Sequence, residues 1–423
     1  MNERPRRRLF LRLQVSIPAV RRHKPDYWLL ILGSLLLAIG LIVVYSISPA
    51  LAASQRSSQN SFVVKQLIDV ALGLIAFVIA ARIPISQWRK LAKPLAVVAI
   101  LGSLVVLVTP INAAYPAHRW IRLGSFSFQI AELIKLALLV GLASFLSIQW
   151  QSGKLADSRK TLQPLLILLV MLGFVVAKLQ SDLGSAGVMV VIMGAMAFVG
   201  GVPLKKIALI SCAVLVLGAL AISTSAYRRD RLSTFLHPEN NCQSSSYQAC
   251  QALISVGSGG ISGLGLGYSV QAYGYLPEAS NDSIFAIIAE KFGFVGTVLV
   301  LAIYSLFISR LKNIIERTAD QFSRLMVVGV LAWFSTQMII NVCAMIGLLP
   351  LKGITLPLIS QGGTSLVFLT AALGLVFQIS RYTSYSVIEP KLTANETTIT
   401  SNNFDGRRVG RPYNASIVTR PRT

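Results

Sequence analysis

Ten apolar runs, each close to twenty residues long, recur between Tyr27 and Ser380 and restrict what this chain can fold into. A bilayer-spanning helix needs about 20 consecutive apolar residues. A transmembrane β-barrel would instead show short segments of alternating polarity, and the chain lacks that pattern. We therefore predict an all-α polytopic membrane protein with ten transmembrane helices, at about residues 27–48, 62–81, 92–110, 130–149, 163–178, 184–201, 206–225, 283–309, 325–347 and 365–380.

The formal net charge of +23 would suit a nucleic-acid partner, but the positions of the charges argue against one. Most of the 39 lysines and arginines lie in the two tails and in alternate loops between the apolar runs. Positive loops face the cytoplasm in membrane proteins. This distribution predicts that both termini are cytoplasmic, and it explains the charge without nucleic acid.

The apolar runs and the distribution of charge divide the chain into three parts. Residues 1–26 form a basic cytoplasmic tail, and residues 27–382 form the ten-helix membrane domain. Within that domain, residues 226–282 make one large extracytoplasmic loop between helices 7 and 8. Residues 383–423 are polar and are expected to be a disordered cytoplasmic tail.

Two of the four cysteines, Cys242 and Cys250, fall in the large outward loop. Extracytoplasmic compartments permit disulfides. We treat this pair as a disulfide candidate, with free thiols as the alternative. No His or Cys spacing in the chain matches a metal site.

The junction YLPEASNDSIFAIIAE carries a polar loop with two carboxylates directly into an apolar helix. Asp282 stands at the boundary, four residues after Glu278. An Asp just ahead of an apolar run is most often an N-cap that accepts hydrogen bonds from free backbone N–H groups. The alternative is that Asp282 is a catalytic carboxylate at the membrane surface.

Several other charged residues lie at or inside the predicted membrane. Glu132 and Lys135 are three residues apart on one helical face, so each can offset the charge of the other. Lys178 and Asp182 flank the break between two apolar runs, where Asp182 is either a helix cap or part of an outward polar pocket. Arg119 belongs to an Arg- and Trp-containing stretch that suits either interface anchoring or substrate binding.

The large loop also holds a positive cluster with Arg228 and Arg231, on the side where positive charge is not expected. Such a cluster either clamps a phosphate or pyrophosphate or pairs with Asp230 and Glu239. The outer turn at residues 352–365 is rich in Pro and Gly. Broken backbone at membrane depth is tolerated only against protein or a polar cavity.

Four outward stretches, taken in order, resemble the SEDS family (shape, elongation, division and sporulation), which includes RodA and FtsW. They are HRWIRLGSFSFQIAELIK, QSDLGSA, YLPEASNDSIFAIIAEKFG and NVCAMIGLLPLKGITLPLISQGGTS. The resemblance covers nearly all of residues 27–382, and the YLPEA motif with the Arg-rich N-terminus leans toward the FtsW branch. The acidic positions of the family pattern are kept, while polar residues around them differ, as in Ser280 and Ser283 on either side of Asn281 and Asp282.

The resemblance implies a peptidoglycan glycosyltransferase in the bacterial cytoplasmic membrane. It would polymerise lipid II, the undecaprenyl-pyrophosphate-linked disaccharide peptide, at the outer face during division or elongation. The family's essential carboxylate falls on Asp282. We expect it to act as the general base, with positioning of a metal or of the acceptor as the alternative. A class B penicillin-binding protein transpeptidase and other proteins of the division or elongation complex are the implied partners. No cofactor is certain, and a divalent cation, Mg or Mn, is a candidate for balancing the charge of the leaving pyrophosphate.

The remaining candidate residues are expected to bind substrate. They are Arg119, Glu132, Lys135, Lys178, Asp182, Arg228, Arg231, Glu278, Ser360, Gly362 and Gly363. Two other functions stay open at this point: a transporter that flips a lipid-linked precursor, and a non-catalytic scaffold of the cell-wall synthesis complex. Transporters often show internal repeats, and none is visible here.

Overall fold

The computed structural model describes residues 23–56, 58, 60–108, 119–123, 126–223, 229, 233, 235–236, 242–243 and 246–383. These residues include most of the predicted membrane domain. The predicted tails at 1–26 and 383–423 lie almost entirely outside the described residues.

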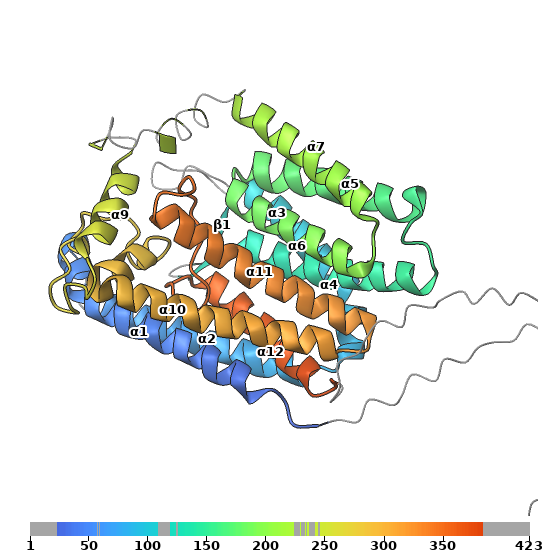
Figure 1. Ribbon diagram of the computed structural model, residues 1–423, viewed down its shortest axis with the longest axis horizontal. Helices are drawn as coiled ribbons and strands as arrows, with labels where there is room; N and C mark the ends of the chain where they lie inside the picture. Colours follow the sequence, from blue (N-terminus) through green and yellow to red (C-terminus); the bar gives the residue numbers. More distant parts are fainter. Residues whose placement is uncertain are drawn as a thin grey trace, which may run out of the picture. The chain divides into compact units, whose positions relative to one another are not determined.

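The described chain is mainly helical, with one small hairpin (Figure 1). The first six elements are α1 (Tyr27–Gln55), α2 (Ser61–Arg82), α3 (Ile85–Val108), β1 (Trp120–Leu123), β2 (Phe126–Gln129) and α4 (Ile130–Gln151). A π-helical segment η1 (Ser158–Leu162), α5 (Gln163–Leu172) and a second π-helical segment η2 (Gly173–Leu179) form one continuous rod. The remaining helices are α6 (Leu183–Gly200), α7 (Leu204–Ser223), α9 (Tyr247–Ser258), α10 (Ile284–Arg317), α11 (Gln321–Met345) and α12 (Thr364–Ser380).

Eight helices among the described residues are long and apolar enough to cross a membrane. They are α1, α2, α3, α4, the rod from Ser158 to Leu179, α6, α10 and α11. The other two predicted runs lie on α7 and on α12, which has 17 residues. The helical class is confirmed, and the count of ten membrane crossings stays a prediction.

The core sits around α4 and α11, which are buried along most of their length. Helix α11 packs against α6, α10 and α4, and α12 packs most extensively against α2. The α2–α12 contact depends on small residues: a Cβ at Gly374 would lie 2.3 Å from the carbonyl oxygen of Phe77. Close backbone approach of this kind stabilises helix pairs inside a bilayer, where the hydrophobic effect between helices is absent.

Three local features differ from the sequence-based expectation. Strands β1 and β2 form an antiparallel hairpin, with Trp120 opposite Gln129, where no strand was predicted. Helix α9 forms inside the large loop. Three helices also extend past their predicted bounds: α1 runs to Gln55 beyond residue 48, α3 begins at Ile85 before residue 92, and α10 continues to Arg317 beyond residue 309. Strands of four residues and one twelve-residue helix are too short to leave a clear periodic signal.

Helix α10 is broken at Gly293, whose φ of 64° and ψ of −162° are open to glycine and strained for other residues. The segment at residues 259–265 lies against this break and satisfies the freed backbone groups. Four hydrogen bonds of 2.9–3.1 Å do this: Leu264 N to Glu290 O, Gly265 N to Lys291 O, Phe294 N to Gly260 O, and Val295 N to Ile261 O. Irregular backbone inside a membrane protein is stable when protein covers it in this way.

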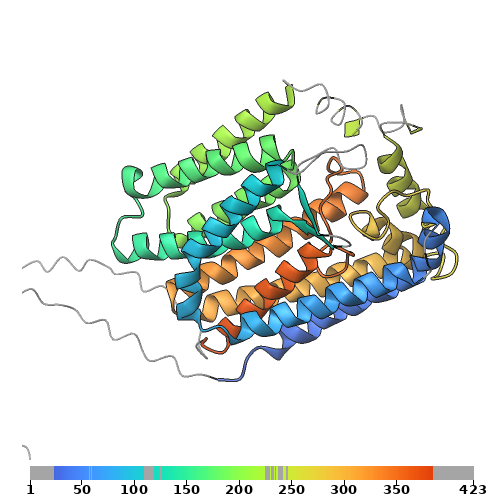
Figure 2. The same cartoon turned by 180° about the vertical axis from the view of Figure 1, so that it is seen from behind.

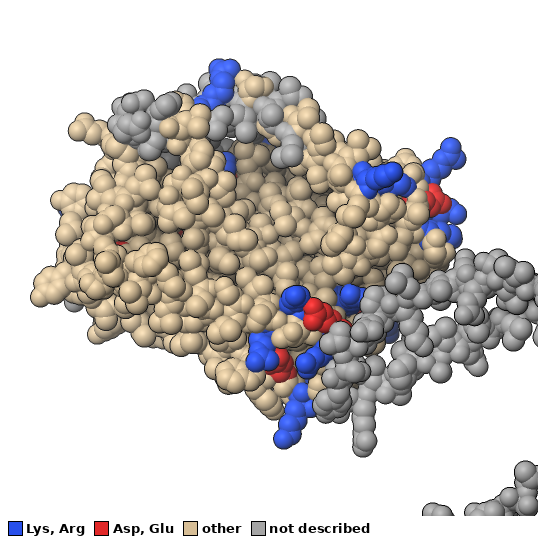
Figure 3. All heavy atoms as spheres, in the orientation of Figure 1, with Lys and Arg blue, Asp and Glu red and all other residues tan. Residues whose placement is uncertain are grey.

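The described chain begins and ends at the same end of the bundle. The His23 N–H donates to the carbonyl of Arg381 at 2.9 Å, and the Asp26 N–H donates to Ser380 Oγ at 3.1 Å. Lys and Arg side chains gather toward this end, while the broad face of the bundle is nearly uncharged (Figure 3). The reverse view places α9 and its neighbouring loops at the opposite end (Figure 2).

Candidate functional site

Asp282 lies at the end of the bundle opposite the described termini, directly before α10. The N-cap position of α10 belongs to Ser283, so the N-cap interpretation of Asp282 is wrong. The Asp282 carboxylate faces the loop between α11 and α12, since a Cβ at Gly353 would lie 3.5 Å from its Oδ2. Its Oδ1 is shielded from solvent. The residue is therefore held between two loops rather than used to begin a helix.

The turn that carries Asp282 is built on Glu278. The φ of Glu278 is 52°, in the left-handed region, and its carbonyl accepts from the backbone N–H groups of Asn281 and Ser283 at 2.9 and 3.2 Å. The side-chain amide of Asn281 donates to the Glu278 carboxylate. Ser283 Oγ donates to the carbonyl of Pro277 at 2.9 Å. Glu278 thus shapes the turn, and its predicted contact with substrate remains a prediction.

The loop at residues 349–363 fixes this turn from the other side. Ser360 Oγ donates to the carbonyl of Asn281 at 2.6 Å and accepts from Leu356 N at 2.8 Å. The backbone N–H of Gln361 donates to the carbonyl of Ser280 at 2.9 Å. Ser360 was predicted from the sequence as a site residue. It bonds to Asn281, the residue immediately before Asp282.

Asn341 joins the two loops to the bundle. Its side-chain amide, on α11, donates to the carbonyl of Asp282 at 2.6 Å and to that of Ile354 at 2.7 Å. Asn341 is 1% exposed, so both hydrogen bonds are buried. The sequence-based predictions assign no role to Asn341, although it stands inside one of the four family-like stretches. Its position in the sequence, a lone Asn at the end of an apolar helix, could have identified Asn341 as a site residue.

Gly363 brings the same loop next to α2, whereas Gly362 lies beside Thr355 and Ser365. The φ of Gly363 is 46°, and a Cβ there would lie 3.9 Å from both carboxylate oxygens of Asp69. The Asp69 carboxylate thus lies close to the Gly363 backbone, and Gln361 Nε2 donates to the carbonyl of Phe62 at 2.7 Å. The sequence analysis assigned no role to Asp69, although a charge inside an apolar run was a signal that could have found it.

The hairpin and α6 complete the assembly. Thr364 Oγ1 donates to the carbonyl of Ser127 at 2.9 Å and accepts from Gln129 N at 3.2 Å. Gln129 Nε2 donates to Asp182 Oδ2 at 3.3 Å. Asp182 Oδ1 accepts from Ser185 N at 2.9 Å, which confirms the predicted cap of α6. All four stretches of the resemblance therefore contribute to one network of contacts.

Glu132 and Lys135 form a buried ion pair, as their spacing predicts. Lys135 Nζ lies 2.8 Å from Glu132 Oε1, with side-chain exposures of 1% and 3%. The ammonium also lies 5.6 Å from the centre of the Trp333 ring. The charge of Lys135 is thus balanced inside the bundle, and its contact with substrate is still a prediction.

The other predicted cations have different surroundings. Arg119 directly precedes β1 and is partly buried, and its Nε is enclosed without a hydrogen-bond partner among the described residues. Lys178 is exposed, and within the described ranges it forms no ion pair with Asp182. Arg228 and Arg231 lie outside the described residues.

Glu290, inside the first half of α10, holds the loop at residues 269–271, which follows the segment that covers the helix break. Its carboxylate accepts from Ser269 Oγ at 2.5 Å and from the backbone N–H groups of Val270 and Gln271 at 2.9 and 3.2 Å. These three hydrogen bonds give Glu290 a structural role beside the candidate site.

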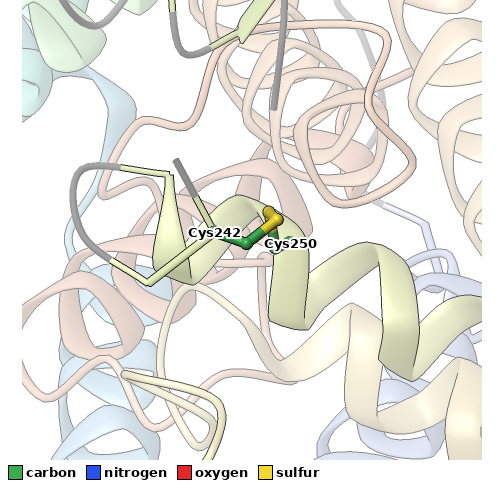
Figure 4. The surroundings of a disulfide bond; sticks show 2 residues. All are labelled: Cys242 and Cys250. Carbon is green, nitrogen blue, oxygen red and sulfur yellow. A yellow bond between two sulfur atoms is a disulfide. The ribbon is translucent and has the colours of Figure 1, made fainter. Parts of the chain in front are cut away.

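Cys242 and Cys250 form a disulfide, with 5.6 Å between their Cα atoms (Figure 4). The bond ties the start of α9 to the segment before it. Among the described residues, no three His, Cys, Asp or Glu side chains come together to hold a metal ion. The divalent cation, Mg or Mn, stays a prediction, and we assign no reaction step to it.

Residues 27–385 match the FtsW, RodA and SpoVE family model, described as cell cycle protein. The chain is 36% identical over 361 residues to the probable peptidoglycan glycosyltransferase FtsW of Coxiella burnetii, covering 84% of this chain and 96% of that one. It is 34% identical over 366 residues to the stage V sporulation protein E of Bacillus subtilis, covering 86% and 99%.

A solved structure is similar over the same part of the chain. It comes from work on how a peptidoglycan synthase complex coordinates polymerization and crosslinking, with a TM-score of 0.67 and 26% identity. The alignment covers 84% of this chain and 98% of that one. Because the family match spans every predicted helix and the relatives are covered almost end to end, this chain belongs to the FtsW, RodA and SpoVE family of multi-pass bacterial inner-membrane proteins.

Proposed function

We propose that this protein is a peptidoglycan glycosyltransferase that polymerises lipid II into glycan strands at the outer face of the inner membrane. The observation that carries the proposal is the position of Asp282. It stands at the end of the bundle opposite the termini, where the four family stretches are joined by hydrogen bonds. The name of the Coxiella burnetii relative supports the same activity.

In the proposed reaction, Asp282 acts as the general base. The hydroxyl of the acceptor sugar attacks the anomeric carbon of the donor, and its proton passes to the Asp282 carboxylate. The new C–O bond forms as the bond from the anomeric carbon to the diphosphate oxygen breaks. A single displacement of this kind inverts the configuration at the anomeric carbon. Asn341 fixes the backbone carbonyl of Asp282 for this step, and the carboxylate lies next to Gly353.

The leaving lipid diphosphate carries the negative charge that develops in the transition state. Fixed cations stabilise such charge most effectively when they are positioned in advance. Arg119 is our first candidate, because its Nε is enclosed without a hydrogen-bond partner among the described residues and its segment leads into the hairpin bonded to Thr364. Lys178, Arg228 and Arg231 are the other candidates for this role.

We further propose that the termini and the end of α10 face the cytoplasm and that a class B penicillin-binding protein transpeptidase binds this chain. The gathering of basic side chains at the end that holds the termini supports the orientation (Figure 3). The synthase complex that contains the similar structure supports a partner that crosslinks the glycan. The family resemblance leans toward a role in division.

The test is polymerisation of purified lipid II by the full-length protein, alone and with its transpeptidase partner. Asp282→Asn should lower glycan formation by at least about 100-fold, because general-base catalysis contributes about 10²–10⁴ in rate. Glu316→Gln is the matched control: it removes a carboxylate near the other end of α10, which among the described residues pairs with Lys312 at the surface. Its rate should remain within about twofold of wild type.

Thermal unfolding of each variant separates a chemical defect from misfolding. A folded Asp282→Asn protein with the wild-type rate would remove Asp282 from the mechanism. Wild-type protein that moves labelled lipid II across vesicles without making glycan would instead establish the flippase alternative. Growth supported by a folded, inactive variant would establish the scaffold alternative.

A further inference from the structure

A second polar site lies at the opposite end of the bundle from Asp282. Three segments enclose a hollow of about 410 Å³: the residues leading into α1, the last turns of α10, and the end of α12. The hydrogen bonds from His23 N to Arg381 O and from Asp26 N to Ser380 Oγ join two of these walls. The hollow is thus formed by bonded segments and is not an incidental gap.

The lining of the hollow is positively charged. Lys24, Arg310 and Arg317 line it, with Asp26 as the one carboxylate. Asp26 is already engaged, because its Oδ1 caps α1 by accepting from Trp28 N at 3.0 Å. Within the part of the chain that the structure describes, none of the three lining cations forms an ion pair.

Neighbouring acidic groups do not change this balance. The acid nearest in sequence on α10, Glu316, is 3.8 Å from Lys312 and does not line the hollow. An anion that entered the hollow would therefore meet three cations and one carboxylate, that of Asp26, whose Oδ1 is held by Trp28 N. Arginine fits phosphate especially well, since its guanidinium donates two parallel hydrogen bonds.

Aromatic side chains place the hollow at the level of lipid headgroups. Tyr27 and Trp28 are each 55% exposed at the start of a membrane-spanning helix, which is the usual position of interfacial aromatic residues. The guanidinium of Arg310 lies 5.4 Å from the centre of the Trp28 ring. The ring thus positions one of the cations at the boundary between apolar helix and water.

We propose that this hollow binds the phosphate headgroup of an anionic glycerophospholipid, in the leaflet on the side of the described termini. The acyl chains would lie along the exposed apolar surface of α1 and α10, next to Ile31 and Leu306. Basic pockets between membrane helices bind anionic headgroups when the cations lie at the level of those headgroups. Nothing in the glycosyl transfer at the other end of the bundle uses this site.

The test is lipid retention by the full-length protein, measured by native mass spectrometry with phosphatidylglycerol or phosphatidylcholine added to detergent. Wild type should retain one phosphatidylglycerol at least fivefold more often than one phosphatidylcholine. Arg310→Gln with Arg317→Gln should abolish this preference. The control, Lys205→Gln with Lys312→Gln, removes two exposed charges outside the hollow and should keep it.

A second variant guards against misfolding, because Arg310 packs on Trp28. Lys24→Gln with Arg317→Gln removes two exposed charges and should also lower phosphatidylglycerol retention at least threefold. Equal retention in this variant and in the control would overturn the proposal. Inorganic phosphate distinguishes a lipid site from a site for a soluble ion: displacement of the lipid by millimolar inorganic phosphate would overturn the lipid assignment.

Discussion

Asn341 is the residue on which the position of Asp282 depends most directly. Asn341→Ala should remove both buried hydrogen bonds, to the carbonyls of Asp282 and Ile354. A buried group left without its partner costs about 1–3 kcal/mol, so the loss of both should destabilise the protein by about 2–4 kcal/mol. Glycan formation should fall at least tenfold as the turn loosens. Thermal unfolding and the lipid II assay measure the two effects.

Ser305→Ala provides the control for Asn341→Ala. Ser305 is exposed on α10 and donates only to the carbonyl of Leu301 in the same helix. Its replacement should change stability by less than about 0.5 kcal/mol. If Asn341→Ala behaved like Ser305→Ala in both assays, the positioning role of Asn341 would be refuted.

The buried pair of Glu132 and Lys135 gives a second prediction at this scale. Glu132→Gln leaves the Lys135 ammonium uncompensated in the core, and breaking a buried pair costs about 3–5 kcal/mol. The double variant Glu132→Gln with Lys135→Met should recover most of the lost stability. Thermal unfolding of both proteins measures this difference, and the exposed Lys312–Glu316 pair, worth about 0–1 kcal/mol, is the control. A double variant as unstable as Glu132→Gln would contradict this account.

The sequence allowed the individual site residues to be named more readily than their contacts. Charge inside an apolar run singled out Glu132 and Lys135, and their pairing followed from helical geometry. Asp282 and Ser360 were found through motifs. The hydrogen bond from Ser360 to Asn281 joins residues 79 positions apart, and no local pattern encodes such a contact.

At the scale of elements, the long helices could be predicted because each must bury about twenty apolar residues in the bilayer. The β1–β2 hairpin, α9 and the break in α10 could not. Gly293 looks like many other glycines in the sequence, and its left-handed φ depends on the 259–265 segment that covers the break. The break is thus set by tertiary contacts and leaves no local sequence signal.

Gly293→Ala tests that explanation. A Cβ at Gly293 would lie 2.3 Å from Gly263 N and 2.5 Å from Ile261 O, so the covering segment would be displaced. We expect a loss of at least about 3 kcal/mol, from backbone strain together with lost hydrogen bonds. Gly257→Ala is the matched control, since Gly257 is exposed in α9 and a Cβ there would have no neighbouring atom within 4 Å. It should be neutral or slightly stabilising, and similar unfolding midpoints for the two variants would disprove the tertiary explanation.

At the scale of the whole molecule, the two ends of the bundle differ in chemistry. One end joins α2, the hairpin, α6, α10 and the 349–363 loop through polar contacts around Asp282. The other end holds both described termini and most of the visible basic side chains (Figure 3). This asymmetry suits the proposed reaction, in which the Asp282 end would act on substrate at one membrane face and the basic end would set the orientation.

Membrane orientation is the prediction that follows from this asymmetry. The disulfide between Cys242 and Cys250 lies at the Asp282 end and requires an oxidising compartment, whereas positive charge at the other end favours the cytoplasm. Alkaline phosphatase fused after residue 246 should be at least tenfold more active than the same enzyme fused after residue 320 or 383. Green fluorescent protein at these three positions should give the reverse order, which controls for expression. Active phosphatase after residue 383 would place the termini outside and turn the proposed site toward the cytoplasm, where its carboxylate could not meet lipid II at the outer face.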